Sequence, residues 1–154
     1  ALYNRLAPRN DLNPDTCYRL PLLFSVNRLT IPVGGTATAS WRFLSLSSVY
    51  GISKTFSNET LTGGTGLTTP VYPDEVNIQV NFNEGATVWI GSNSEPCSLG
   101  TIGDAAHVTR VAPIVATRND VWDLTLTGQA AMANGVFGTV TLHGVKIYNA
   151  GGAI

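Results

Sequence analysis

"VNIQVNFNEGATVWIGSN", Val76 to Asn93, begins with a strict alternation of apolar residues and uncharged amides. Because successive side chains of a β-strand point to opposite faces, this alternation predicts a strand with one buried face. The solvent-facing positions hold amides where a soluble protein usually has lysine, glutamate or threonine. The apolar set is Val76, Ile78, Val80 and Phe82, and the amide set is Asn77, Gln79 and Asn81.

Low charge extends over the whole chain. Charged residues make up 12% of the 154 residues, where about 25% is typical of globular proteins. The sequence has only two lysines, Lys54 and Lys146, and a formal net charge of -1. Interface cores are depleted in lysine, glutamate and aspartate because charge is costly to desolvate. We therefore expect a protein that packs against copies of itself.

The charge balance also restricts the other partners of the chain. A net charge close to zero attracts neither nucleic acid nor an anionic membrane surface. No segment approaches the roughly 20 consecutive apolar residues of a membrane span. The basic residues near the N-terminus are balanced by acidic ones, so we expect no direct contact with nucleic acid. These residues are Arg5 and Arg9 against Asp11 and Asp15.

The length of the chain is typical of one domain. Residues 1–17 have no period of two or 3.6, so they predict an extended N-terminal arm before a β-sandwich over residues 18–149 and a tail over 150–154. Large apolar groups in the arm indicate that it docks on its own body or on a neighbour. These candidate interface residues are Leu2, Tyr3, Leu6 and Leu12.

About eight short strands separated by turn residues are expected, with no helix beyond one turn at 129–134, which predicts an all-β sandwich or barrel. Eight strands with changes of face favour an antiparallel sandwich of jelly-roll type. Pro21 restricts its strand to a sheet edge, and Pro113 interrupts another. The inward set changes parity near Phe43–Leu44, with Leu44 and Leu46 next inward, and again near Gly144, which predicts bulges or changes of sheet.

A search for catalytic or ligand-binding motifs gives no candidate. His107 and His143 lack metal-ligand spacing with cysteine or carboxylates, and the glycine-rich segments lack the lysine of a phosphate-binding loop. We therefore expect neither an enzyme nor a bound metal or cofactor. Cys17 and Cys97 either form one disulfide or remain free, and the sequence leaves both alternatives open.

Two of the three tryptophans, Trp41 and Trp122, share the parity of aliphatic neighbours and are predicted to lie in the core. Trp89 differs, since Val88 and Ile90 already alternate inward and would leave the indole outside. An outward tryptophan is a candidate for an interface between subunits. A core position and a sugar-stacking platform remain alternatives for it.

The segment "NFNEGATVWIGSN" followed by "TRNDVWDLTLTG" resembles a pattern of small bacteriophage structural proteins. In that pattern a strand of the type V-x-I-G precedes a loop and then a strand of the type D-V-W. The similarity covers Val76 to Gly128, about a third of the chain. It implies a jelly-roll virion protein, either a capsid subunit or a capsid-decorating protein, located in the virion and associated with itself and other virion proteins.

Two other classes share the all-β, threonine- and asparagine-rich composition. A fimbrial or adhesin subunit is one, although donor-strand pilins need an alternating apolar extension and "ALYNRLAPRN" does not alternate cleanly. A sugar- or receptor-binding β-sandwich module is the other. Particle mass in solution and electron microscopy distinguish shells, fibres and a binding monomer.

Overall fold

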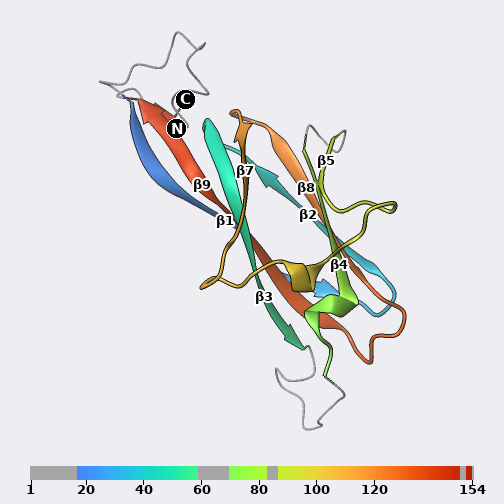
Figure 1. Cartoon of the computed structure of the whole chain (residues 1–154). Helices are drawn as coiled ribbons and strands as arrows, with labels where there is room; N and C mark the ends of the chain where they lie inside the picture. Colours follow the sequence, from blue (N-terminus) through green and yellow to red (C-terminus); the bar gives the residue numbers. More distant parts are fainter. Residues whose placement is uncertain (1–16, 59–69, 83–86, 150–151, 154) are drawn as a thin grey trace.

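The computed structural model of the chain describes residues 17–58, 70–82, 87–149 and 152–153. They form two antiparallel β-sheets packed together (Figure 1), which confirms the all-β sandwich. The strands are β1 (Tyr18–Ile31), β2 (Thr36–Arg42), β3 (Ser47–Asn58), β4 (Val76–Phe82), β5 (Thr87–Ile90), β6 (Cys97–Ser98), β7 (Thr109–Ala116), β8 (Val121–Gly128), β9 (Val136–Asn149) and β10 (Gly152–Ala153).

Strands from distant parts of the chain lie side by side in each sheet. The β1 sheet has the order β1-β9-β3-β7, with β10 paired to β9. The β2 sheet has the order β2-β8-β4-β5, with β6 paired to β4. The described chain thus has ten strands instead of the eight expected. The two additional strands, β6 and β10, have two residues each. β10 falls within the predicted tail.

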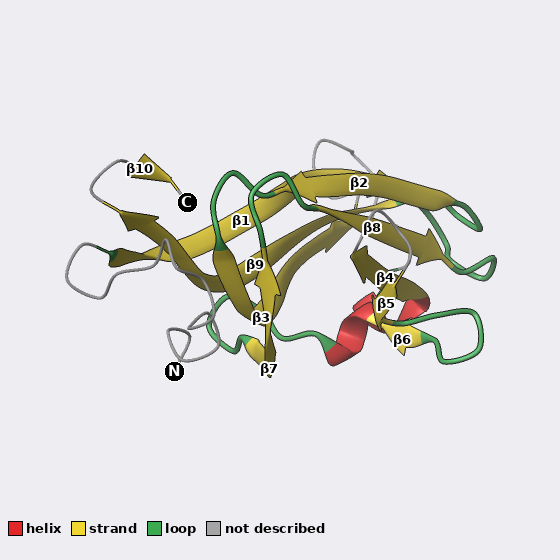
Figure 2. Cartoon of the chain, turned by 90° about the horizontal axis from the view of Figure 1, so that it is seen from above, coloured by secondary structure: helices red, strands yellow, loops and turns green. Residues whose placement is uncertain are grey.

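Helical structure in the described residues is limited to two single-turn 3₁₀ helices, η2 (Pro73–Glu75) and η3 (Leu99–Thr101). The helical turn expected at 129–134 is a hydrogen-bonded turn, in which the Met132 N–H donates to the Gln129 carbonyl at 3.2 Å. Viewed from above, both 3₁₀ helices lie beside β4 and β5 (Figure 2).

The chain changes sheet between β2 and β3, as the parity change near Phe43–Leu44 predicted. Phe43 and Leu46 are buried in this crossing segment. The expected inward position of Leu44 is wrong, because its side chain is 70% exposed. The crossing segment has no partner strand to fix alternate faces, so strand parity does not extend through it.

The two interrupted strands follow their sequence signals. β1, which contains Pro21, pairs with β9 alone among the described strands and is therefore an edge strand. β7, which contains Pro113, is at the opposite edge, and its register with β3 shifts between Val49 and Gly51. The same shift occurs between β3 and β9, where a Cβ added to Gly144 would overlap the Ser48 carbonyl. The parity of β9 changes at this place, as predicted.

An aromatic cluster fills the space between the sheets. Trp41 and Trp122 face each other across β2 and β8 and are buried, as predicted. The Trp122 ring lies 5.0 Å from that of Phe43, which lies 5.6 Å from that of Phe24 on β1. The Trp41 Nε1–H donates to the carbonyl oxygen of Phe24 at 3.0 Å, so the cluster joins the sheets by a hydrogen bond as well as by packing.

Trp122→Ala should lower the free energy of unfolding by about 3–5 kcal/mol, because a buried tryptophan leaves a large cavity when truncated. Chemical denaturation measures this loss. Val88→Ala is the control, since Val88 is 49% exposed and its truncation should cost about 0.5 kcal/mol or less. Equal losses in the two variants would contradict the placement of the core.

Candidate interaction surfaces

Hydroxyl and amide side chains cover the outer face of the β2 sheet. The register places Thr38, Thr125 and Gln79 in one row across β2, β8 and β4. The adjacent row, two residues further along each strand, consists of Thr36, Thr127 and Asn77. These groups can hydrogen-bond to water or to a neighbour without the cost of desolvating a charge.

The polar groups of this face also bond to one another. Gln79 Nε2 donates to Asn81 Oδ1 at 3.2 Å, and Ser40 Oγ donates to the Asp123 carboxylate at 2.8 Å. The alternation of β4 is confirmed, since Val76, Ile78 and Val80 are buried and the amides between them are half-buried.

Hydroxyl groups recur on the β1 sheet. Ser25, Thr141 and Ser53 form a row across β1, β9 and β3, in which the Ser25 and Thr141 hydroxyls lie 2.7 Å apart. The Ser53 hydroxyl lies 2.6 Å from His143 Nε2. Arg28 stacks over the Phe137 ring, with 4.2 Å from its guanidinium carbon to the ring centroid.

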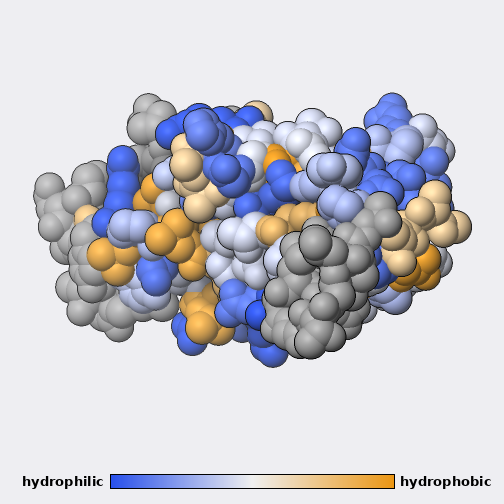
Figure 3. Space-filling view, turned by 90° about the horizontal axis from the view of Figure 1, so that it is seen from below, coloured by the Kyte–Doolittle hydropathy of each residue, from blue (hydrophilic) through white to orange (hydrophobic). Residues whose placement is uncertain are grey.

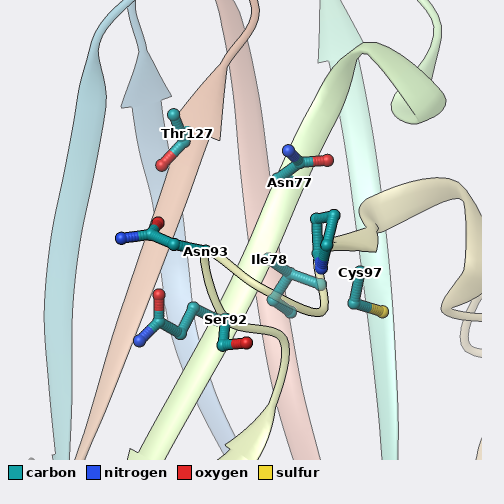
Figure 4. A pocket seen from close by; sticks show the side chains of 8 residues that line it. Asn77, Ile78, Ser92, Asn93, Cys97 and Thr127 are labelled. Atoms are coloured by element: carbon teal, nitrogen blue, oxygen red, sulfur yellow. The ribbon is translucent and has the colours of Figure 1, made fainter.

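A polar pocket of about 270 Å³ lies beneath the loop that follows β5 (Figure 4). Its described lining includes no charged or aromatic side chain. The loop is fixed by Ser92, whose N–H donates to the Glu95 carbonyl at 2.9 Å and whose Oγ accepts from the Glu95 N–H at 2.8 Å. The pocket can therefore hydrogen-bond a small neutral group. The lining includes Asn77, Gln79, Ser92, Asn93, Cys97 and Thr127.

Gly91 makes this loop possible. Its φ of 68° lies in the left-handed region, and a Cβ there would overlap the Ile78 carbonyl. A residue with a side chain would strain the backbone and push the loop away from β4.

The predicted outward position of Trp89 is wrong. The indole packs against the core, with its ring 5.2 Å from that of Trp122, whereas Val88 is 49% exposed. The register explains the reversal, because Val80 pairs with Ile90 while the adjacent Asn81 pairs with Val88. Trp89 is thus the extra residue of a β-bulge, which allows both Trp89 and Ile90 to pack inward.

Trp89→Ala should lower the free energy of unfolding by about 2 kcal/mol or more, through loss of contact with Trp122. Trp89→Phe keeps an aromatic ring and serves as the matched variant with a smaller loss. Denaturation and sedimentation on the same samples separate folding from association. Unchanged stability with lost association would instead place the indole at a contact between copies.

An apolar groove of about 190 Å³ lies where β1 and β9 approach the crossing segment between β2 and β3. We call it the β1–β9 groove. Leu44 is 70% exposed beside it. Apolar surface also appears elsewhere, in patches separated by polar side chains (Figure 3). The described groove lining includes Leu22, Leu23, Phe24, Leu44, Lys146 and Tyr148.

The two cysteines are free thiols in the structure. Cys17 packs against a small cluster of Leu46 and Ile147 at the end of the β1 sheet, whereas Cys97 packs against the main core. Of the two alternatives left by the sequence, the structure has the unpaired one. The other candidate interface residues, Leu2, Tyr3, Leu6 and Leu12, lie outside the described residues.

The two histidines have different surroundings. His107 is exposed, and its Nδ1 lies 3.1 Å from Asp104 Oδ1, a hydrogen bond that lowers the pKa of Asp104. His143 is half-buried, and burial lowers its pKa below the ordinary value. Burial also lowers the pKa of Lys54, against the opposing effect of Asp104. The described residues contain no cluster of three or more histidine, cysteine or acidic side chains able to hold a metal.

The lowered pKa of His143 predicts a pH-dependent stability. A base with a lower pKa in the folded state binds its proton preferentially in the unfolded chain. The free energy of unfolding should therefore fall as the pH decreases through about 6.5, the ordinary histidine value. His143→Gln should reduce this fall, whereas His107→Gln should retain it. Urea denaturation on both sides of this pH tests the assignment, and identical pH profiles for wild type and His143→Gln would refute it.

The sequence matches no protein-family model, and no curated protein resembles it at a significant level. Within the described part of the chain, no helix is long and apolar enough to cross a membrane.

Proposed function

We propose that this chain is a structural protein of a virion, either a capsid subunit or a capsid-decorating protein, which assembles with copies of itself. The observation that carries the proposal is the outer face of the β2 sheet, where rows of threonines and amides cross β2, β8 and β4, and Asp123 and Arg42 are confined to one end. A surface of this kind costs little to desolvate against a neighbour.

The order of the strands supports a jelly roll as the finer description of the sandwich. In a jelly roll of eight strands, a long antiparallel ribbon that pairs first with last, second with seventh, third with sixth and fourth with fifth is wrapped into two sheets. The strands of four or more residues pair in this manner. The pairs are β1 with β9, β2 with β8, β3 with β7, and β4 with β5.

A sugar- or receptor-binding module is the second candidate, supported by the neutral polar pocket under the loop after β5. Protein sites for sugars often add an aromatic ring to such hydrogen-bonding groups, but the bulge turns Trp89 toward Trp122. The pocket therefore supports this function less strongly than the surface supports assembly. A fimbrial or adhesin subunit remains a further alternative, with fibres as its distinguishing product.

The full chain should self-associate, and sedimentation with electron microscopy should show closed shells or a defined oligomer that binds capsids. Fibres would favour the fimbrial alternative. A monomer that stays monomeric at high concentration and binds glycans would favour the binding module. Either result would overturn the virion assignment.

Thr125→Lys tests the surface that carries the proposal. An ammonium in the middle of the hydroxyl face should weaken association about tenfold or more if a neighbour covers this face, because the charge must be desolvated. The control is Thr117→Lys, at an exposed position in the turn before β8. Equal association of the two variants would show that neighbours do not cover the outer face of the β2 sheet.

A further inference from the structure

We propose that the β1–β9 groove binds the N-terminal segment, residues 1–16, of a second copy of this chain. The inference rests on the proposed function, since it names a surface through which the copies associate. It goes further by assigning both sides of one contact.

The groove is an apolar surface that the described sandwich leaves open. The core is already closed by buried rings such as Trp41, Phe43 and Trp122. Leu44 nevertheless exposes 70% of its surface at the groove, and exposed apolar surface of this kind marks sites of contact. The groove is also a concavity, so a protruding apolar side chain can fill it.

The N-terminal segment has the chemistry that the groove requires. It carries Leu2, Tyr3, Leu6 and Leu12, with two arginines balanced by two aspartates. Lys146 is the charged residue among the described groove lining, with its ammonium 5.8 Å from the Tyr148 ring centroid. Asp11, next to Leu12 in the sequence, supplies a carboxylate for this ammonium when Leu12 enters the groove.

The position of Cys17, where the N-terminal segment joins the sandwich, favours binding of this segment to the groove of a second copy over the groove of its own chain. Cys17, the first described residue, packs against Ile147. The groove is lined by Lys146 and Tyr148, the two neighbours of Ile147 on β9. Because successive strand side chains point to opposite faces, Cys17 lies on the face of β9 opposite to the groove.

The segment is also long enough to reach a neighbour. Sixteen residues precede Cys17, and an extended chain spans at most about 3.3–3.6 Å per residue. Pro8 and Pro14 restrict the backbone and favour extended neighbours. The segment of one copy can therefore leave its own body and enter the groove of an adjacent copy without wrapping around the sheet edge.

A photochemical cross-link tests this arrangement in the full-length chain. Leu44 is replaced by photoreactive benzoylphenylalanine in unlabelled protein, which is mixed in denaturant with ¹⁵N-labelled wild-type chain and refolded together with it. After irradiation, mass spectrometry should find residue 44 joined to labelled peptides from residues 1–16. Benzoylphenylalanine at Thr38, an exposed position on the outer face of β2, is the control and should not capture this segment.

The other outcomes overturn the inference in distinguishable ways. Arm peptides that carry only the unlabelled isotope would show docking within one chain. Labelled peptides from outside residues 1–16 would show that another surface of a copy covers the groove, with the proposed self-assembly still standing. A chain that sediments only as a monomer would remove both the inference and the proposed function.

A second variant makes the test independent of the cross-linker. Leu12→Ser should weaken association about tenfold or more if its side chain fills the groove. The sandwich should keep its unfolding midpoint, because its core is closed by the described strands. Asn10→Ser is the matched control in the same segment. Equal association of the two variants would contradict the assignment of Leu12 as the residue that enters the groove.

Discussion

The packing of Trp122 against its aromatic neighbours is the interaction on which the rest of the sandwich depends. Its ring contacts Phe43 from the crossing segment, and Phe43 in turn contacts Phe24 on β1. Phe82 and Trp89 contact the same indole from β4 and β5 at 5.7 and 5.2 Å. Trp122 therefore joins three strands of its own sheet and is linked to the β1 sheet through Phe43, and aromatic rings of this size contribute much of the apolar area buried by a small domain.

Three of the acidic residues act locally in turns. Asp104 accepts from the Ala106 N–H at 3.0 Å, Asp120 accepts from the Thr117 N–H at 2.8 Å, and Glu75 accepts from the Tyr72 N–H at 2.9 Å. Each bond satisfies a backbone donor that the turn leaves without a ladder partner. With these carboxylates in turns and Asp123 near one end of the sheet, the rows formed by Thr36, Thr38, Thr125 and Thr127 with Asn77 and Gln79 contain no charged side chain, which is the physical basis of the proposed assembly surface.

The alternating positions could be predicted because the pleat imposes a period of two wherever a strand pairs with its neighbour in an unbroken register. This explains the correct placement of Val76, Ile78 and Val80, and the core positions of Trp41 and Trp122. The prediction for Trp89 was wrong because a bulge adds one residue to β5. The position of this bulge depends on how β5 pairs with β4, and the sequence of β5 alone does not specify that pairing. The polar pocket was not predicted, since loop 91–96 and β4 meet only in the folded chain.

The different lengths of the two sheets explain why an apolar groove exists at all. β1 and β9 have 14 residues each, whereas β2 has seven and β8 has eight. At about 3.3 Å per residue, the longer strands extend roughly 20 Å further than the shorter ones. Figure 2 shows β1 and β9 continuing past β2 and β8 toward β10.

A two-layer sandwich buries only the area that both sheets share, so the extension needs other cover on each face. On one face, Leu46 and Ile147 form their own cluster with Cys17. On the other face, the same strands present the β1–β9 groove, with Leu44 of the crossing segment exposed beside it. Shortening β1 and β9 would remove this exposed surface without disturbing Trp122. Strands that keep the extra length therefore leave an apolar face that a further chain segment can cover, and the extension is the part of the fold best suited to join one copy to another.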